Sequence, residues 1–380
     1  MARGPDGGHR EGVSMPEAFG VTFVGGLQTT RADPAGGART LFDPAATVTS
    51  AQVLEAIGFD QAILVYSSYS LDPFAIAATV ASHTERLGLV IALRPNTAAP
   101  TAAAKSYATI DQLSAGRTQV HLIAGGNESD QWRDGDFIDK DARYRRMGEY
   151  IDILRRAWSS ETSFDHDGEF YRIVDYTPKV KPFAGVPLPI SLGGSSEAAY
   201  RVGAERADVF ALWGEPLADT RGQLDRVRAL ATEAGTAGPE AYMISFKPVI
   251  APSDELAWAK ADALLERLTA HRARARPRGE IARHVGLPGA EASKRILRIA
   301  ERGAVHDTAL WTEPAQATGA IGSSAALVGG YDTVASAVAA YADLGIRRFS
   351  FSAYGGLDDY IEMGTQLLPR IRALLDGHGA

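Results

Sequence analysis

Short apolar runs alternate with amphipathic segments along most of this chain. The apolar runs are rich in Val, Ile, Leu, Phe and Ala, which is typical of strands buried on both faces. The expected strands are Phe19–Val24, Asp60–Tyr66, Leu87–Leu93, Thr118–Ala124, Pro187–Leu192, Ala207–Trp213, Met243–Ile250 and Arg348–Ser352. The expected helices are Val48–Ile57, Pro73–His83, Ala102–Leu113, Tyr144–Trp158, a helix after Ser196, Leu217–Ala234, Asp254–Leu268, Glu291–Arg302, Val334–Leu344 and Leu357–Leu375.

The alternation of strands and helices predicts a parallel sheet that is covered by helices on both faces. Eight such units over this length fit an α/β fold in which the sheet closes, the (β/α)8 or TIM barrel. A doubly wound open sheet is the alternative, because periodicity does not distinguish the two. Phe164–Pro182 has the pattern of a hairpin, and Arg272–Thr318 is poorly patterned around its one amphipathic helix.

The 380 residues are expected to form one domain over residues 17–380. Residues 1–16 are polar and Gly-rich, with no apolar stretch, and predict a disordered lead rather than a signal peptide. No apolar run approaches the ~18 residues that a membrane helix needs.

Composition narrows the function further. The chain has 45% hydrophobic and 22% charged residues, as ordinary globular proteins do. It has no Cys, which excludes disulfides, thiolate metal sites and Cys nucleophiles, and which is compatible with a cytoplasmic protein. Its net charge of −7 argues against nucleic acid as a partner.

The turn Gly193-Gly194-Ser195-Ser196 separates a predicted strand from a predicted helix. Glycine lets the backbone approach a ligand closely, and a Ser can cap the helix. The free N–H groups and the dipole at the start of the helix suit a phosphate monoester. An ordinary turn with a Ser cap explains the same residues.

In a barrel, chemistry lies at the carboxyl ends of the strands. These ends carry Gly25-Gly26, Tyr66–Ser70, Arg94–Asn96, Gly125–Asn127, Gly193–Ser196, Trp213–Glu215, Phe246–Pro248 and Ser352–Tyr354. The eight His residues are scattered, and neither a metal-ligand spacing nor a Gly-x-Ser-x-Gly or Walker motif is present, so we expect no metal. A phosphate cradle with a rim of Asn, Ser, Trp and Tyr suits an enzyme whose cofactor performs the difficult step.

Four rim residues have both a functional and a structural interpretation. Asn96 and Asn127 offer a donor and an acceptor, as the polar edge of a ring would need, but turn chemistry explains them equally well. Trp213 could flank a flat ring or simply pack. Tyr144 opens a helix behind an acidic loop, and a solvated surface is its alternative interpretation.

Several segments, in order and with sensible spacing, carry a family resemblance. They are ALRPNTAAPTAAAKSYATIDQLSAGR, HLIAGGNESD, ARYRRMGEYIDILRRAW, PLPISLGGSSEAAYRVGAERADVFALWGEP and SAYGGLDDYIEMGTQLLP. From about Phe19 to Leu375 the chain resembles the bacterial luciferase-like flavin-dependent monooxygenases, and it is most similar to their alkanesulfonate monooxygenase group. The resemblance implies a TIM barrel that binds reduced FMN supplied by a separate NAD(P)H:flavin reductase. It further implies that O2 reacts at the flavin C4a, and that the resulting peroxide oxygenates an organic substrate.

The resemblance also assigns residues. It places the FMN phosphate at Gly193, Gly194, Ser195 and Ser196, and it adds Tyr144, Gly125, Asn127 and Trp213 to the flavin site; Asn96 joins them as a rim residue. Tyr354 and Ser70 are the expected helpers in the oxygen step. The segment 272–318 resembles the mobile lid of the family, although a plain surface insertion is the alternative.

The chain departs from the alkanesulfonate enzymes at the substrate. Where they carry a His after strand one, this chain has Gly25-Gly26, and Ser70 replaces a Cys. Their Arg and His on strand six correspond to Phe246 and Pro248, which we expect to face the barrel interior while Lys247 points away. With Tyr69 these residues predict an apolar pocket for a larger or neutral substrate, such as an organosulfur compound or a biosynthetic intermediate.

Other functions stay open at this point. A deazaflavin-dependent oxidoreductase of the same superfamily shares the barrel and the phosphate turn. A non-catalytic flavin-binding protein would not need a lid. A phosphate-sugar isomerase or aldolase would need a Schiff-base Lys or an acid/base pair, and none is identifiable. The resemblance implies a homodimer or homotetramer.

Overall fold

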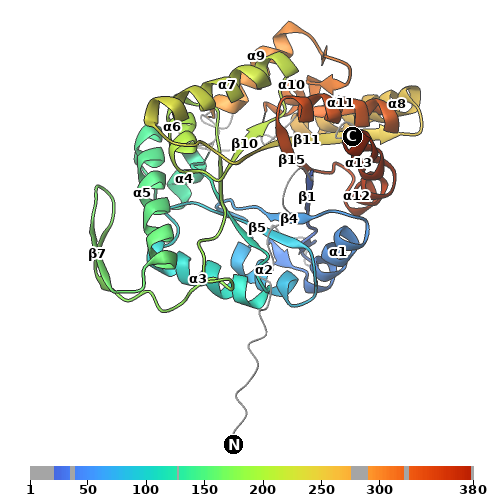
Figure 1. Ribbon diagram of the computed structural model, residues 1–380. Coiled ribbons are helices and arrows are strands. Elements are labelled where there is room, and N and C mark those ends of the chain that lie inside the picture. The colour runs from blue at the N-terminus through green and yellow to red at the C-terminus, as the bar shows by residue number, and fades with distance from the viewer. Residues whose placement is uncertain (1–20, 35–38, 126–127, 275–289, 321–324, 378–380) are drawn as a thin grey trace, which may run out of the picture.

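Eight parallel strands surround a common axis and close on themselves, since β10 pairs with β11 as well as with β9 (Figure 1). The computed structural model describes residues 21–34, 39–125, 128–274, 290–320 and 325–377. In pairing order the barrel strands are β1 (Thr22–Gly26), β4 (Gln61–Leu64), β5 (Gly88–Leu93), β6 (Thr118–Leu122), β9 (Ile190–Gly193), β10 (Val209–Trp213), β11 (Ala241–Ala251) and β15 (Ile346–Phe351). The predicted TIM barrel is confirmed, and the open sheet is excluded.

Helices follow the strands and cover the outside of the barrel. They are α1 (Pro44–Ala56), α2 (Pro73–Ala81), α3 (Pro100–Leu113), α4 (Glu128–Arg133), α5 (Lys140–Ser159), α6 (Glu197–Arg206), α7 (Leu217–Ala234), α8 (Asp254–Arg274), α9 (Glu291–Arg302), α10 (Glu313–Thr318), α11 (Tyr331–Asp343), α12 (Leu357–Glu362) and α13 (Leu368–Gly377). A π-helical turn, Met363–Leu367, joins the last two, so the predicted final helix is a composite.

Helix starts follow local sequence signals. Asp43 and Asp72 each accept a hydrogen bond from the backbone N–H three residues on, and a proline follows each of them. An acidic cap followed by Pro is a strong start signal. For this reason α1 begins at Pro44 rather than at the predicted Val48, whereas α7 and α9 have the predicted bounds.

Strand β11 is longer than its neighbours and has two roles. Its first half closes the barrel, and its second half, from Lys247 to Ala251, pairs in parallel with β14 (Ala326–Gly330). The short strands β13 (Leu310–Trp311) and β12 (Val305–His306) extend that pairing antiparallel. The sequence analysis missed β14 because its five residues end in two glycines, which strands disfavour.

Two further pairs of strands are antiparallel: the predicted hairpin, β7 (Phe164–Asp167) with β8 (Arg172–Tyr176), and the short β2 (Thr30–Arg31) with β3 (Leu41–Phe42). The main core lies between the strands and the helices. A smaller cluster that includes Val24, Val90 and Met243 fills the barrel interior and identifies the inward face of each strand.

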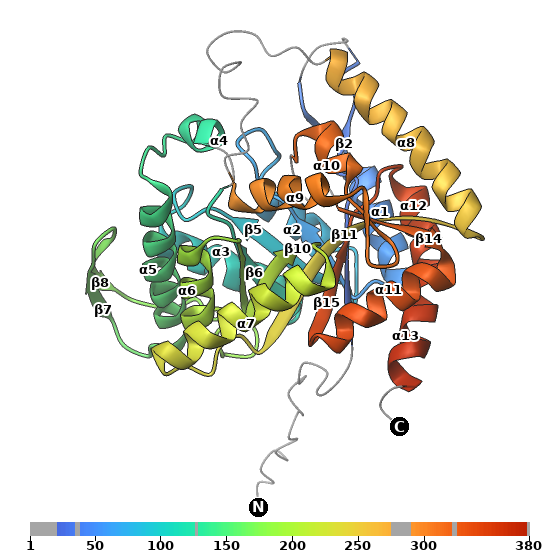
Figure 2. The same cartoon turned by 90° about the horizontal axis from the view of Figure 1, so that it is seen from above.

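The region predicted as a lid is partly described. Helices α8, α9 and α10 lie with α4 on one side of the barrel (Figure 2). Ile296 and Ile299 of α9 are buried in the main core. Residues 275–289 lie outside the described residues, so the mobility of the lid stays a prediction. Within the described ranges, no helix is long and apolar enough to cross a membrane.

Candidate functional site

The Gly-Gly-Ser-Ser turn joins β9 to α6 at the carboxyl end of the barrel. Ser196 is the N-cap, and its side chain accepts a hydrogen bond from the N–H of Ala199. The N–H groups at Glu197 and Ala198 have no partner inside the helix, as is general for a first turn. The structure therefore confirms a Ser-capped helix start after the glycines, with Ser195 buried beside it, and anion binding at this turn stays a prediction.

Tyr144 of α5 closes over this turn. Its side chain is buried, and its hydroxyl forms a hydrogen bond with Ser196. A Cβ on Gly194 would lie 2.3 Å from the Tyr144 oxygen and 2.6 Å from the Cβ of Ala199, so only glycine fits there. Burial raises the pKa of Tyr144 to about 12, and the phenol therefore remains a donor. The structure brings together the residues that the resemblance had paired.

A buried polar chain leads from the turn to α9. Tyr200 hydrogen-bonds with Ser195 and donates to Gln223 at 2.8 Å. Gln223 donates to the Glu215 carboxylate at 2.9 Å, and Arg295 of α9 donates to both oxygens of that carboxylate at 2.8 and 2.6 Å. Through Glu215 the inserted helix is fixed to the end of β10. The sequence showed Glu215 only as part of Trp-Gly-Glu, and it gave no signal for Arg295.

Two predicted rim positions lie after β5 and β6. Both amide atoms of Asn96 are buried and have no hydrogen-bond partner in the described part of the chain. Gly125 has a φ of 78°, and a Cβ there would lie 1.6 Å from the amide nitrogen of Gln131, so glycine is required. The predicted Asn127 lies outside the described residues. Asn96 therefore offers a buried donor and acceptor pair without a partner among the described residues, and its role at the flavin stays a prediction.

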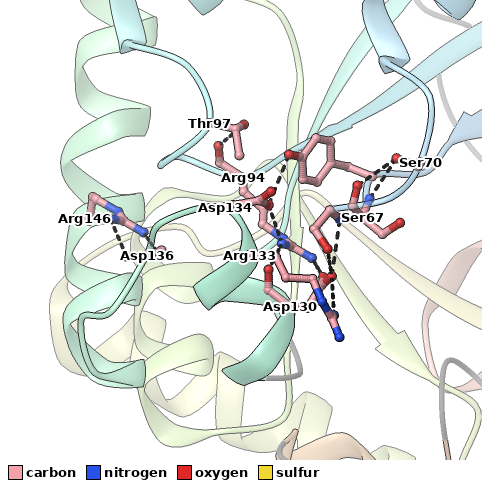
Figure 3. Close-up of polar contacts among 11 residues, drawn as sticks. Ser67, Ser70, Arg94, Thr97, Asp130, Arg133, Asp134, Asp136 and Arg146 are labelled. Atoms are coloured by element: carbon pink, nitrogen blue, oxygen red, sulfur yellow. Dashed lines mark hydrogen bonds and ion pairs between the residues drawn. The ribbon is translucent and has the colours of Figure 1, made fainter. Parts of the chain in front are cut away.

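Arg94, at the end of β5, is buried and forms ion pairs with Asp130 and Asp134 of the segment around α4 (Figure 3). Tyr66 donates to Asp134 at 3.2 Å, and its ring lies 5.1 Å from the Arg94 guanidinium. The hydroxyl of Ser68 also bonds to Asp130. This network fixes the loops after β4, β5 and β6 to one another. The sequence had shown Arg94 only within a motif.

The loop after β4 holds two other predicted residues. Ser70 accepts a hydrogen bond from the Ser67 N–H and donates to the Ser67 carbonyl, both at 3.0 Å, so its hydroxyl closes a local turn. The catalytic role of Ser70 stays a prediction, and its hydroxyl proton is already donated to the Ser67 carbonyl. Tyr69 is 72% exposed on the rim, so it is available to a substrate only at the entrance.

Strand β11 presents different residues to the interior from those predicted. Met243 belongs to the interior cluster, and alternation puts Ser245 and Lys247 on the same face. Phe246 is fully buried on the outer face, where its ring packs 4.8 Å from that of Tyr341 of α11. The expectation that Phe246 faces inward and Lys247 outward is therefore wrong. Sequence alone did not give the register, and a slip of one residue exchanges the two faces.

The inward face of β11 continues into the predicted helper Tyr354. The Lys247 ammonium lies 5.1 Å from the centre of the Tyr354 ring. The Tyr354 hydroxyl is buried and has no hydrogen-bond partner among the residues described. Burial raises its pKa, so it remains protonated. Pro248 borders a small cavity of about 30 Å³ beside Tyr354 and α8, and its predicted role in substrate binding stays a prediction.

Trp213 and His121 complete the interior. Trp213 ends β10 and pairs with Ser245 in register, which turns it inward as the flavin prediction requires. His121 lies inside the barrel below the rim, and its Nδ1 is 2.9 Å from the Ser191 hydroxyl. Burial lowers the pKa of His121 to about 4, which keeps the ring neutral. From the sequence, His121 was only one of eight scattered histidines without a metal-ligand spacing.

Known structures with the same fold include different enzymes. A riboflavin lyase is 19% identical over 95% of this chain and 92% of its own, with a TM-score of 0.71. The EDTA monooxygenase of Chelativorans sp. BNC1 is 16% identical over 95% and 94%, with a TM-score of 0.69. An F420-dependent secondary alcohol dehydrogenase is 13% identical over 93% and 99%, with a TM-score of 0.68.

The sequence profile of the luciferase-like monooxygenase family matches residues 19–348, which is most of the chain. The match confirms the predicted family and enzyme class. The finer placement in the alkanesulfonate group stays a prediction. With its closed barrel and the glycine turn at its carboxyl end, this chain belongs to the luciferase-like monooxygenase family.

Proposed function

We propose that this protein is an FMN-dependent monooxygenase that receives reduced FMN from a separate NAD(P)H:flavin reductase and uses O2 to oxygenate a small organic substrate. The observation that carries the proposal is the turn at Gly194, which Tyr144 closes so tightly that a Cβ would not fit. The F420-dependent and FMN-containing neighbours share the fold, so the fold alone does not choose between the two flavins.

The residues present fit a flavin mononucleotide. The first turn of α6, with Ser195, Ser196 and Tyr144, would hold the phosphate. The unpartnered amide of Asn96 offers a donor and an acceptor to the edge of the ring system. Trp213 faces the interior between the turn and β11, and it would limit the position of the flat ring. Bound reduced FMN would supply the electrons that activate oxygen.

The chain's own groups then control the surroundings of the reaction. Tyr354 is a protonated donor without a partner in the described residues, and it would hold a proton next to the reacting oxygen. Arg295 and Glu215 fix α9 beside the phosphate turn, and this helix would help to exclude water. A homodimer or homotetramer in the cytoplasm remains part of the proposal.

Anaerobic titration with reduced FMN tests the cofactor. We expect saturable binding, and we expect oxygen uptake in the presence of a reductase and NAD(P)H to depend on added substrate. Ser196→Ala should weaken FMN binding, because it removes the helix cap that shapes the cradle. Tight binding of a deazaflavin without binding of FMN would assign the protein to the hydride-transfer branch.

Alkanesulfonate turnover is a separate question. The prediction of a neutral substrate rested on an apolar pocket, and the inward-facing Lys247 removes that premise. Efficient release of sulfite from a panel of alkanesulfonates would place the protein in that group, and its absence would leave other organic substrates.

A further inference from the structure

Lys247 is a cation without an anionic partner among the described residues. It is partly buried at the inward face of β11, and it forms no ion pair with any described residue. Its ammonium instead lies over the aromatic ring of Tyr354, 5.1 Å from the ring centre. Burial lowers the pKa of Lys247, and no carboxylate opposes this effect. A charge taken out of water without a partner is unfavourable, so such a site is completed when an anion binds.

The carboxylates on the neighbouring elements already have partners. Asp359 accepts hydrogen bonds from the N–H groups of Tyr354 and Gly355. Glu362 pairs with Lys260 at 3.0 Å, and Asp254 accepts the N–H of Gly330. Lys247 therefore stands apart from the charge pairs that stabilise α8 and α12.

The position of Lys247 also separates it from the phosphate cradle. The cradle ends β9, Trp213 ends β10, and Lys247 lies on β11, so three adjacent strands carry the three groups in order. A phosphate at the cradle would be neutralised there. A flat ring that extends from the cradle past Trp213 would point toward Lys247 at the carboxyl end of the barrel. A second reactant would have to approach the ring from that side.

We infer that Lys247, with the hydroxyl of Tyr354, binds an oxyanion carried by the substrate, a carboxylate or a sulfonate. The inference rests on the proposed function, because it names the substrate class of the same site. Lys247 supplies the charge, and Tyr354 supplies a neutral donor whose hydroxyl has no partner in the described structure. The rest of the substrate would extend toward the exposed rim at Val65 and Tyr69. An anionic head with an apolar body fits this arrangement.

The test is a binding experiment on the FMN-loaded protein with matched pairs of probes. Phenylacetate and octanoate are compared with phenylacetamide and octanamide, by calorimetry and by the change in absorbance of bound FMN. The variants are Lys247→Met and Lys247→Arg. Lys260→Met is the matched control, because it removes a nearby lysine that is already paired with Glu362.

We expect at least one carboxylate to bind the wild-type protein more tightly than its amide. Lys247→Met should weaken carboxylate binding by about tenfold or more without affecting the amide, as is typical when a charged hydrogen-bond partner is lost. Lys247→Arg should restore most of the affinity, and Lys260→Met should leave it unchanged.

Three results would overturn the inference. The first is equal carboxylate affinity in wild type and Lys247→Met, and the second is failure of every carboxylate to bind the FMN-loaded wild type. The third is that Lys247→Met weakens FMN itself, which would assign the lysine to the flavin. If FMN does not bind the wild type at all, the proposed function fails, and the same titrations without flavin still test Lys247.

Discussion

Two cations at the carboxyl end of this barrel differ in their partners: one is paired with carboxylates, and the other has no ion pair with the described residues. Arg94 on β5 is buried against two carboxylates, a phenol ring and a backbone carbonyl of α4. Lys247 on β11 is also partly shielded from water, but its ammonium lies over an uncharged ring, that of Tyr354. Arg94 directly follows β5, and Lys247 lies within β11 where that strand begins to pair with β14, so their difference comes from the segments that pack around each of them.

The different partners of Arg94 and Lys247 imply different roles, one in stability and one in ligand binding. A buried cation with a complete set of acceptors holds loops in place, and removing it leaves its anions unpaired. A shielded cation without acceptors contributes little to stability, and an anion that enters the site supplies the missing partner. We therefore expect substitutions at Arg94 to affect folding and those at Lys247 to affect ligand binding.

Arg94→Met should have the largest effect on stability. It leaves Asp130 and Asp134 without their cation, and breaking a buried pair in this way costs about 3–5 kcal/mol. Chemical unfolding measures the loss. Arg145→Met is the control, because its pair with Glu169 is exposed to solvent and should contribute far less to the free energy of unfolding. Equal losses in the two variants would mean that the Arg94 network is not the anchor described above.

His121 sharpens the comparison as a buried titratable group that stays neutral. Its folded pKa of about 4 lies below the value of 6.5 for an exposed histidine, so the folded state favours the neutral ring. The stability linked to this shift is complete above pH 6.5 and is lost as the pH falls toward 4, in total about 3 kcal/mol. The free energy difference between wild type and His121→Asn should shrink by that amount from pH 7 to pH 4. A difference independent of pH would contradict the assignment.

Gly194→Ala tests the phosphate side of the mouth. The new Cβ would displace Tyr144 or Ala199, so the affinity for FMN should fall by about tenfold or more, which is about 1.4 kcal/mol. Gly222→Ala on α7 is the control, since no atom lies within 4 Å of the position of its Cβ. Unchanged FMN affinity in Gly194→Ala would mean that the FMN phosphate does not bind at this turn.

Lys247→Met should have the smallest effect on folding. The variant loses no ion pair with the described residues, and its free energy of unfolding should stay within about 0.5–1 kcal/mol of the wild-type value. A loss of several kcal/mol would show that Lys247 has a structural partner, and the distinction from Arg94 would fail.

The sequence predicted the elements well because their signals are local. Strand and helix periodicity identified all eight barrel strands, although many predicted ends differ from the observed ones by a few residues. The strand β14 was missed, since a short run ending in two glycines resembles a loop. The Gly-Gly-Ser-Ser turn was located correctly between a strand and a helix because these elements are contiguous in the chain.

Contacts between distant segments were decided by the tertiary structure. The family resemblance assigned both Tyr144 and Gly194 to the flavin site, but their contact, which excludes a Cβ, is set by the packing of α5 against α6. The bond between Arg295 and Glu215 joins residues 80 positions apart, which periodicity does not reveal. Which face of β11 points inward depends on its register with β10 and β15, and a step of one residue exchanges Phe246 for Lys247. The sequence by itself determined the fold, the family and the position of the Gly-Gly-Ser-Ser turn, because these depend on local patterns. The inward position of Lys247 was decided by the register of β11, because that register is set only when the sheet closes into a barrel.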